Sequence, residues 1–354
     1  MTTTIEATGA PAPRWGGWTR TAIAFTAFGA ALFISILVSL CVGRFSVSAP
    51  RALEILFRAI TNPGMSVETM DERIVLLVRT PRVIISAMAG AALATAGVAL
   101  QGVFRNPLVS PEVLGISQGG AFGGALAITL GIWGVPLLAI VFISGFSALV
   151  FVGLLARIDG RTEIITVILS GMVVGSLFSA MVSLLQFIAD PNSSLPAIVY
   201  WLMGSFATAT WDRVLISVPG LAIGIGLLWA LRFRLNVLSL DDAEARSLGA
   251  NPDRERWLVF ALVALIVGCQ VAVSGIVGWV GLVIPHAARL IVGYDHRRLL
   301  PATALLGAAF MVTIDTLART VTAAEIPLGV LTAIVGAPVF AVLLRRHFRD
   351  KEAR

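Results

Sequence analysis

Lysine is almost absent from this chain of 354 residues. Lys351 is the only one, and every other basic residue is an arginine. A GxxxxGK[ST] phosphate-binding loop therefore cannot form, and neither can a lysine Schiff base inside an apolar segment. If ATP drives this protein, a separate chain must bind the nucleotide.

Charge is also scarce, because Asp, Glu, Lys and Arg make up 13% of the residues, whereas a soluble domain carries about 25%. Hydrophobic residues make up 57%, and the mean hydropathy is +0.92. The apolar runs are continuous and roughly 20 residues long, which favours membrane helices over the alternating strands of a barrel. The sequence predicts an all-α, polytopic membrane protein.

Cysteine and histidine are too few to suggest a metal site. Cys41 and Cys269 lack metal-ligand spacing and are interpreted as small core residues. His286 has no nearby carboxylate on its helix, and His296 and His347 lie in basic segments. No GxSxG or HExxH motif occurs, so we expect no catalytic residue, no cofactor and no metal.

Ten membrane spans are expected between a polar N-terminal tail (residues 1–20) and a basic C-terminal tail (345–354). The permease-like body is thus residues 21–344. A short amphipathic helix after Pro50 is expected at the membrane surface, and residues 196–206 are too short to span. The expected spans are 21–42, 81–104, 114–131, 136–156, 164–188, 213–231, 257–274, 276–293, 299–320 and 327–344.

The arginines predict the orientation. Of the 26 basic residues, 18 fall on the side that holds both termini and 8 on the other. Cytoplasmic loops carry the excess of Lys and Arg, so both termini are expected in the cytoplasm. The same distribution explains the pI of 10.5 without a nucleic-acid partner.

A charged loop, residues 232–256, is expected to protrude on the cytoplasmic side. Ser239 and Asp242 have capping-box spacing for a short helix that ends before Gly249. Asn251 and Pro252 then begin another helix. A solvated loop and a docking surface for a cytosolic partner are the two interpretations.

Asp315 and Arg319 are spaced i,i+4 near the outer end of the ninth span, and we interpret them as a structural ion pair. A proton relay would need a chain of such groups across the span. None is evident, which disfavours an ion-coupled secondary transporter. An intramembrane enzyme is disfavoured because no nucleophile and base are found together.

The most distinctive stretch is RTPRVIISAMAGAALATAGVALQGVFRNPLVSPEVLGIS, starting at Arg79: a long uncharged run, a polar turn, and a second apolar run. Together with YWLMGSF, LDDAEARSLG, GIVGWVGLVIPHAARLIVGYDHRRLLP and AEIPLGVLTAIVGAPVF, it resembles the FecCD family. These proteins are the membrane permeases of ABC importers for ferric siderophores, haem and cobalamin. The blocks extend over nearly all of residues 79–344.

The resemblance implies a ten-helix subunit that pairs with a second permease subunit in the cytoplasmic (inner) membrane. Two ATPase subunits would bind below and an extracytoplasmic substrate-binding protein above. It also implies three sets of site residues. Arg79, Arg82 and Arg319 would dock the binding protein; Asn106, Pro107, Leu108 and Thr162 would form the cytoplasmic gate; Asp242, Glu244, Arg246, Ser247, Leu248 and Gly249 would meet the ATPase.

The function implied is therefore translocation of an iron-siderophore complex, with haem or cobalamin as alternative cargo. The segment before the fifth span, which contains Thr162, departs from the family pattern of small hydroxyl residues. Arg79 and Arg82 are expected outside and the Arg105–Leu108 turn inside. One stretch would then connect the docking surface to the gate.

Overall fold

The computed structural model describes residues 16–62, 64, 66–158 and 161–352. Within them the chain is a bundle of α-helices, with one antiparallel pairing between the two-residue strands β1 (Arg157–Ile158) and β2 (Arg161–Thr162). The expected all-α class is confirmed.

Among the described residues, seven segments are long and apolar enough to cross a membrane. Three further helices coincide with the remaining expected spans. The seven are α1 (Gly16–Cys41), α4 (Thr80–Val103, continuous with α3, Met70–Glu72, and a π-helical turn, Arg73–Arg79), α6 (Val135–Ala156), α7 (Ile164–Ile188), α9 (Trp211–Ala230), α12 (Pro252–Ser274) and α14 (His296–Thr320); the three are α5 (Ile116–Thr129), α13 (Val280–Val292) and α15 (Leu328–Glu352).

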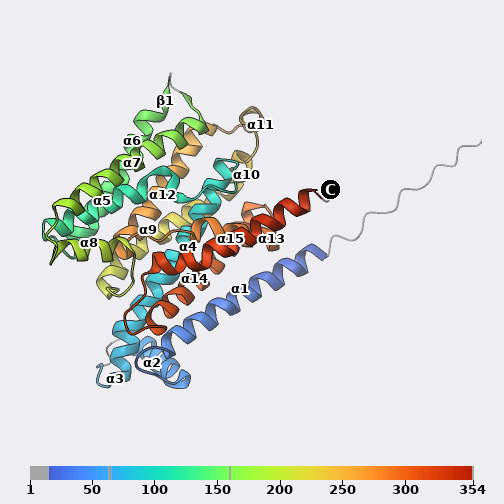
Figure 1. Cartoon of the computed structure of the whole chain (residues 1–354). Coiled ribbons are helices and arrows are strands. Elements are labelled where there is room, and N and C mark those ends of the chain that lie inside the picture. The colour runs from blue at the N-terminus through green and yellow to red at the C-terminus, as the bar shows by residue number, and fades with distance from the viewer. Residues whose placement is uncertain (1–15, 63, 65, 159–160, 353–354) are drawn as a thin grey trace, which may run out of the picture.

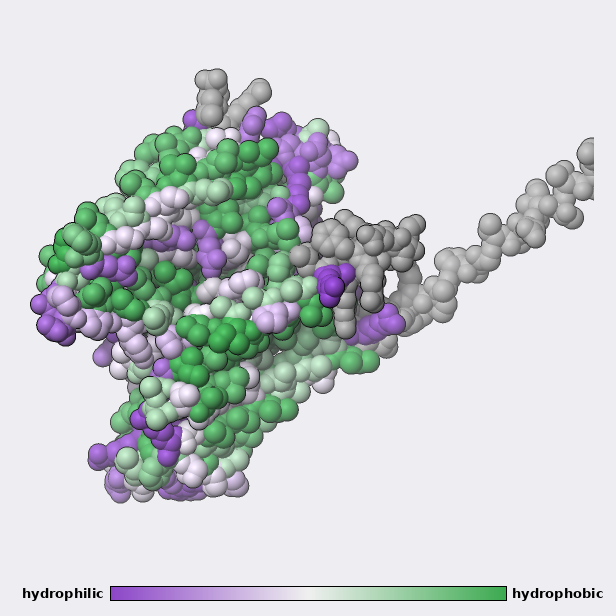
Figure 2. All heavy atoms as spheres, viewed as in Figure 1, coloured by the Kyte–Doolittle hydropathy of each residue, from purple (hydrophilic) through white to green (hydrophobic). Residues whose placement is uncertain are grey.

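The bundle has two polar ends. One carries α2 (Ala49–Thr61) and α3; the other carries α10 (Arg232–Leu238), α11 (Asp242–Ser247) and β1 (Figure 1). We name them the α2 end and the α11 end. Hydrophobic residues dominate the visible surface between them, while hydrophilic residues gather near both (Figure 2). The chain is therefore a multi-pass membrane protein.

The expected boundaries hold best where no break interrupts the apolar run. The fifth expected span matches α7 at both ends. The first helix already begins at Gly16, and the last continues to Glu352 through the expected basic tail, because no glycine or proline follows Pro338. Residues 1–15 and 353–354 lie outside the described part.

Two helix breaks lie inside the bundle. The first, residues 104–115, connects α4 to α5 through a 3-10 turn (Pro111–Leu114), and the second, residues 275–279, connects α12 to α13. Gly97 of α4 packs so closely on Gly281 of α13 that a Cβ there would lie 1.9 Å from the Gly281 carbonyl oxygen. Gly97 is about 9 Å from the end of α4, so α13 begins well within the apolar layer.

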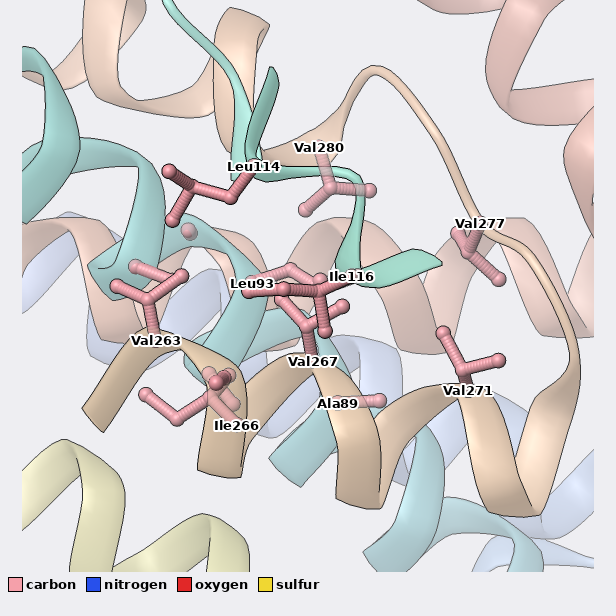
Figure 3. Close-up of a cluster of buried hydrophobic side chains, with 14 of the residues drawn as sticks. Ala89, Leu93, Leu114, Ile116, Val263, Ile266, Val267, Val271, Val277 and Val280 are labelled. Atoms are coloured by element: carbon pink, nitrogen blue, oxygen red, sulfur yellow. The ribbon is translucent and has the colours of Figure 1, made fainter. Parts of the chain in front are cut away.

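Side chains of both breaks enter one apolar core. Leu114 of the first break and Val277 of the second gather around α12, together with Ile116 and Val280, the first residues of α5 and α13 (Figure 3). All four are buried. The breaks are therefore fixed by packing against α12.

Small residues bring α4 and α14 into close contact. A Cβ added to Gly90 would lie 2.2 Å from the Gly307 carbonyl oxygen, and one added to Gly307 would lie 2.5 Å from the Gly90 oxygen. Close backbone approach replaces the hydrophobic drive that lipid does not supply. The pair thus sets the separation of two central helices.

We expect Gly90→Val to lower the free energy of unfolding by about 1–3 kcal/mol, because the added side chain must separate α4 from α14. Thermal unfolding of the purified protein in detergent measures this. Gly29→Val is the matched control, because a Cβ there meets nothing within 4 Å. Equal melting temperatures for the two variants would contradict the prediction.

Candidate functional site: the helix breaks and the gate turn

The predicted gate residues form a tight turn at the α11 end. Arg105 has a left-handed φ of 51°, and the Asn106 side-chain oxygen accepts a hydrogen bond from the Leu108 backbone N–H at 2.9 Å. Leu108 is 51% exposed. Asn106 and Pro107 line a cavity of about 510 Å³. Its other lining residues are Gln101, Gly102, Arg105, Asn236, Ser239, His286, Arg289, Leu290, Tyr294, Asp295 and His296.

The fourth predicted gate residue, Thr162, lies in β2, away from this turn in sequence. The position of its side chain lies outside the described part of the structure. Its gate role stays a prediction.

Arg105 joins the gate turn to the charged loop. Its guanidinium donates to Asp241 at 3.0 Å and also to Asp242. Asp242 in turn accepts from Arg256 at 3.0 Å. Burial opposes ionisation of Asp242, but the hydrogen bonds from Arg256 and Arg105 outweigh it and lower the pKa of this carboxyl. Sequence analysis missed this connection between gate and loop.

The predicted coupling residues form α11 and the turn after it. The capping box is wrong: Asp241 precedes α11, and the Ser239 hydroxyl donates instead to the Leu235 carbonyl at 2.8 Å. The glycine stop is correct, since Gly249 has a φ of 78°. Of the predicted coupling residues, five lie exposed: Glu244, Arg246, Ser247, Leu248 and Gly249.

Gln101 satisfies one backbone carbonyl of the first break and one at the start of α13. This buried α4 side chain donates from Nε2 to the carbonyl oxygen of Val109 at 3.1 Å and to that of Gly281 at 3.3 Å. Gln270 of α12 similarly donates to the Gly275 carbonyl at 3.0 Å. Such partners are required because lipid offers none to a bare amide or carbonyl.

Glu112 is a carboxylate that sequence analysis missed. It sits in the 3-10 turn of the first break, directly beside the second: a Cβ on Gly278 would lie 2.8 Å from its Oε1. Its one hydrogen-bonding side chain among the described residues is Ser110, at 3.5 Å. An intramembrane carboxylate without a cation is a functional candidate. The signal was its place in the RNPLVSPE turn.

Arg82 lies in a buried ion cluster at the α2 end. Its guanidinium donates to both oxygens of Asp315, at 2.8–3.0 Å, and to both oxygens of Glu325, at 2.9 and 3.0 Å. The cluster joins α4, α14 and the turn before α15. The expected i,i+4 pair is secondary, because Arg319 Nε lies 3.9 Å from Asp315, beyond hydrogen-bond distance.

The other two predicted docking arginines hold the end of α1. Arg79 donates to the carbonyls of Leu40, Cys41 and Phe45. Arg319 donates to the carbonyl of Val42 and to Ser39. These contacts satisfy carbonyls at a helix C-terminus, where positive charge is favourable. Docking by these arginines stays a prediction; all three guanidinium groups are engaged within the chain.

The model of the FecCD transport family matches residues 31–346. The chain belongs to the FecCD transport family. The resemblance seen in the sequence blocks is thereby confirmed, and the match extends over both helix breaks, the gate turn and α11.

Curated relatives in this family carry different cargo. The chain is 44% identical to the molybdate import permease MolB of Haemophilus influenzae, over 88% of this chain and 92% of MolB. It is 39% identical to the cobalamin import permease BtuC of Halobacterium salinarum, over 79% and 74%. These relatives are permease proteins of import systems, so this FecCD chain is a transport subunit and not an enzyme.

A solved structure described as an inward-facing conformation of a metal-chelate type ABC transporter has the same fold. Its TM-score is 0.83 at 42% identity, over 92% of this chain and 99% of the other. The FecCD chain is thus an ABC importer permease subunit.

We expect Arg82→Gln to destabilise this FecCD chain by about 3–5 kcal/mol, because it leaves Asp315 buried without its bidentate partner. Thermal unfolding in detergent, without any binding protein, measures the change. Arg73→Gln is the control, since Arg73 is exposed near the same end. A variant as stable as the wild type, but weak in binding-protein docking, would show that Arg82 acts through docking alone.

Proposed function

We propose that this permease subunit moves an iron-siderophore complex across the cytoplasmic membrane, with energy from a separate ATPase dimer. A second permease subunit, identical or related, completes the pathway. An extracytoplasmic binding protein delivers cargo to the α2 end, and the ATPase binds at the α11 end. The arginine excess on the terminus-bearing side supports this orientation, with both termini cytoplasmic.

The contact that supports ATPase coupling is the one between Arg105 and the two aspartates before and in α11. Glu244 and Leu248 are exposed and would contact the ATPase. Asp242 of α11 accepts a hydrogen bond from Arg105, which belongs to the gate turn. A displacement of α11 would therefore pull on the turn that carries Asn106 and Leu108. ATP-driven closure of the ATPase dimer would thus alter the gate without a covalent link.

The pathway is proposed beside the two helix breaks. Gly171 of α7 touches the first break, where a Cβ would lie 2.0 Å from the Val113 carbonyl oxygen. Gly336 of α15 touches Trp279 of the second, where a Cβ would lie 2.8 Å from the Trp279 Cβ. The second subunit would face α7 and α15, so that cargo passes along the breaks.

Glu112 favours a metal chelate as cargo. Within the described residues of the two breaks, Glu112 is the charged side chain that lies where the breaks meet. No arginine that the structure describes neutralises it. When it is ionised, this carboxylate repels a dianionic oxyanion, whereas a bulky chelate spreads its charge. Molybdate is the second candidate, because the relative at 44% identity is a molybdate permease. Haem and cobalamin remain alternatives of the same machinery.

The coupling proposal predicts that Arg105→Gln retains ATP hydrolysis by the assembled transporter but lowers cargo uptake roughly tenfold, which corresponds to about 1.4 kcal/mol. The reason is that α11 then moves without the gate turn. Hydrolysis and uptake are measured together in proteoliposomes. Arg234→Gln, which removes an ion pair to Glu255 on the same face, is the control. Parallel loss of both activities would contradict the proposed link.

The cargo proposal predicts ATP-dependent uptake of a ferric siderophore and little uptake of molybdate in proteoliposomes with the cognate ATPase and binding protein. Glu112→Gln should retain chelate uptake and increase molybdate uptake, because the repelling charge is removed. Glu68→Gln, an exposed acid at the α2 end, is the control. Preferential molybdate uptake by the wild type would overturn the siderophore assignment, and uptake driven by an ion gradient without ATP would overturn the ABC mechanism.

A further inference from the structure

An apolar groove runs between α6 and α12, which pack against each other. Its volume is about 390 Å³. Gly153 opens it, because a Cβ there would lie only 3.2 Å from the Trp257 ring. Val150 and Leu154 on its rim are exposed, so the groove faces outward from the bundle. It is lined by Leu149, Val150, Gly153, Leu154, Arg157, Trp257 and Ala261.

Arg157 lines the α11 end of this groove, and Arg254 lies near that end, in the first turn of α12. Arg157 follows Gly153 by one helical turn, and Arg254 lies two turns before Ala261 on the same face of α12. Both side chains are exposed. Neither guanidinium has a hydrogen bond or ion pair with any residue that the structure describes, so the groove ends in two uncompensated positive charges.

Neighbouring arginines are paired, which makes these two distinct. Arg234 binds Glu255 at 3.1 Å, Arg246 lies 3.6 Å from Asp253, and Arg256 binds Asp242 at 3.0 Å. The acids in the first turn of α12, Asp253 and Glu255, thus pair with other arginines and not with Arg254. The arrangement presents positive charge where the apolar surface ends.

We propose that the α6–α12 groove binds an anionic phospholipid. One acyl chain lies along Leu149, Gly153 and Ala261, and the headgroup phosphate accepts hydrogen bonds from Arg157 and Arg254. Trp257 lies at the level between chain and headgroup, where tryptophan is enriched. Basic pockets between helices at the cytoplasmic side are suited to such headgroups.

The apolar groove and the two arginines together favour an anionic phospholipid over other ligands. A zwitterionic lipid would fill the groove, but its choline or ethanolamine offsets the charge that the arginines attract. A free phosphate would pair with the arginines but leave the apolar groove unfilled. Lipid bound here would also restrain the first turn of α12, where Arg256 holds Asp242 of α11.

The test is native mass spectrometry of the full chain titrated with phosphatidylglycerol or phosphatidylcholine. We expect the wild type to prefer phosphatidylglycerol, and Arg157→Gln/Arg254→Gln to bind it roughly 10- to 30-fold more weakly, since each arginine contributes a headgroup interaction. The matched control is Arg20→Gln/Arg297→Gln, which removes the same charge from the same end outside the groove.

A second variant separates the groove from the charges. Gly153→Leu fills the groove beside Trp257 while both arginines remain, and it should weaken phosphatidylglycerol binding by a similar factor. The proposal is overturned if the arginine double variant binds as the wild type does, if phosphatidylcholine binds equally well, or if millimolar inorganic phosphate displaces the lipid.

Discussion

The amide of Gln101 is the contact on which the inner architecture depends. A helix that breaks inside an apolar layer exposes carbonyl groups that lipid cannot satisfy. Gln101 donates to the Val109 carbonyl of the first break and to the carbonyl of Gly281, 180 residues away at the start of α13. Without that amide, two buried acceptors would lose a partner, at about 1–3 kcal/mol each. The first break and the start of α13 are therefore held together by one side chain.

This dependence makes α4 the central element of the subunit. Its start carries Arg82 in the ion cluster, and its body carries Gln101, which joins the first break to α13. Its end leads into Arg105 and the gate turn. Close glycine contacts to α13 and α14 leave it no room to shift alone. The more mobile parts must then be the segments at its ends. A gate in the turn after α4, held from outside by α11, agrees with that distribution of rigidity.

The sequence predicted most of the helices but few of the contacts among their polar groups. Hydropathy located α7 at both ends because no break or charge interrupts its run. It placed α13 too early, since the apolar residues of 275–279 look the same whether helical or not. Arg82 was expected to face a partner protein, because its acids lie 233 and 243 residues away. Distances of that kind follow from packing, which a single sequence does not contain. Glu112 was overlooked for the same reason, because only the folded structure places its carboxylate beside Gly278 of the second break.

The near absence of lysine acquires a structural reason. The Arg82 guanidinium donates hydrogen bonds from two of its edges to two carboxylates. Arg79 donates to three carbonyls, and Arg105 donates to two aspartates. An ammonium is a compact, strongly hydrated point charge and cannot hold such planar, divergent partners. Guanidinium is also less costly to bury because it is more weakly hydrated. The chain therefore uses arginine wherever one cation must join several elements. The scarcity of lysine, which excludes a GxxxxGK[ST] phosphate-binding loop, also reflects how the helices are held together.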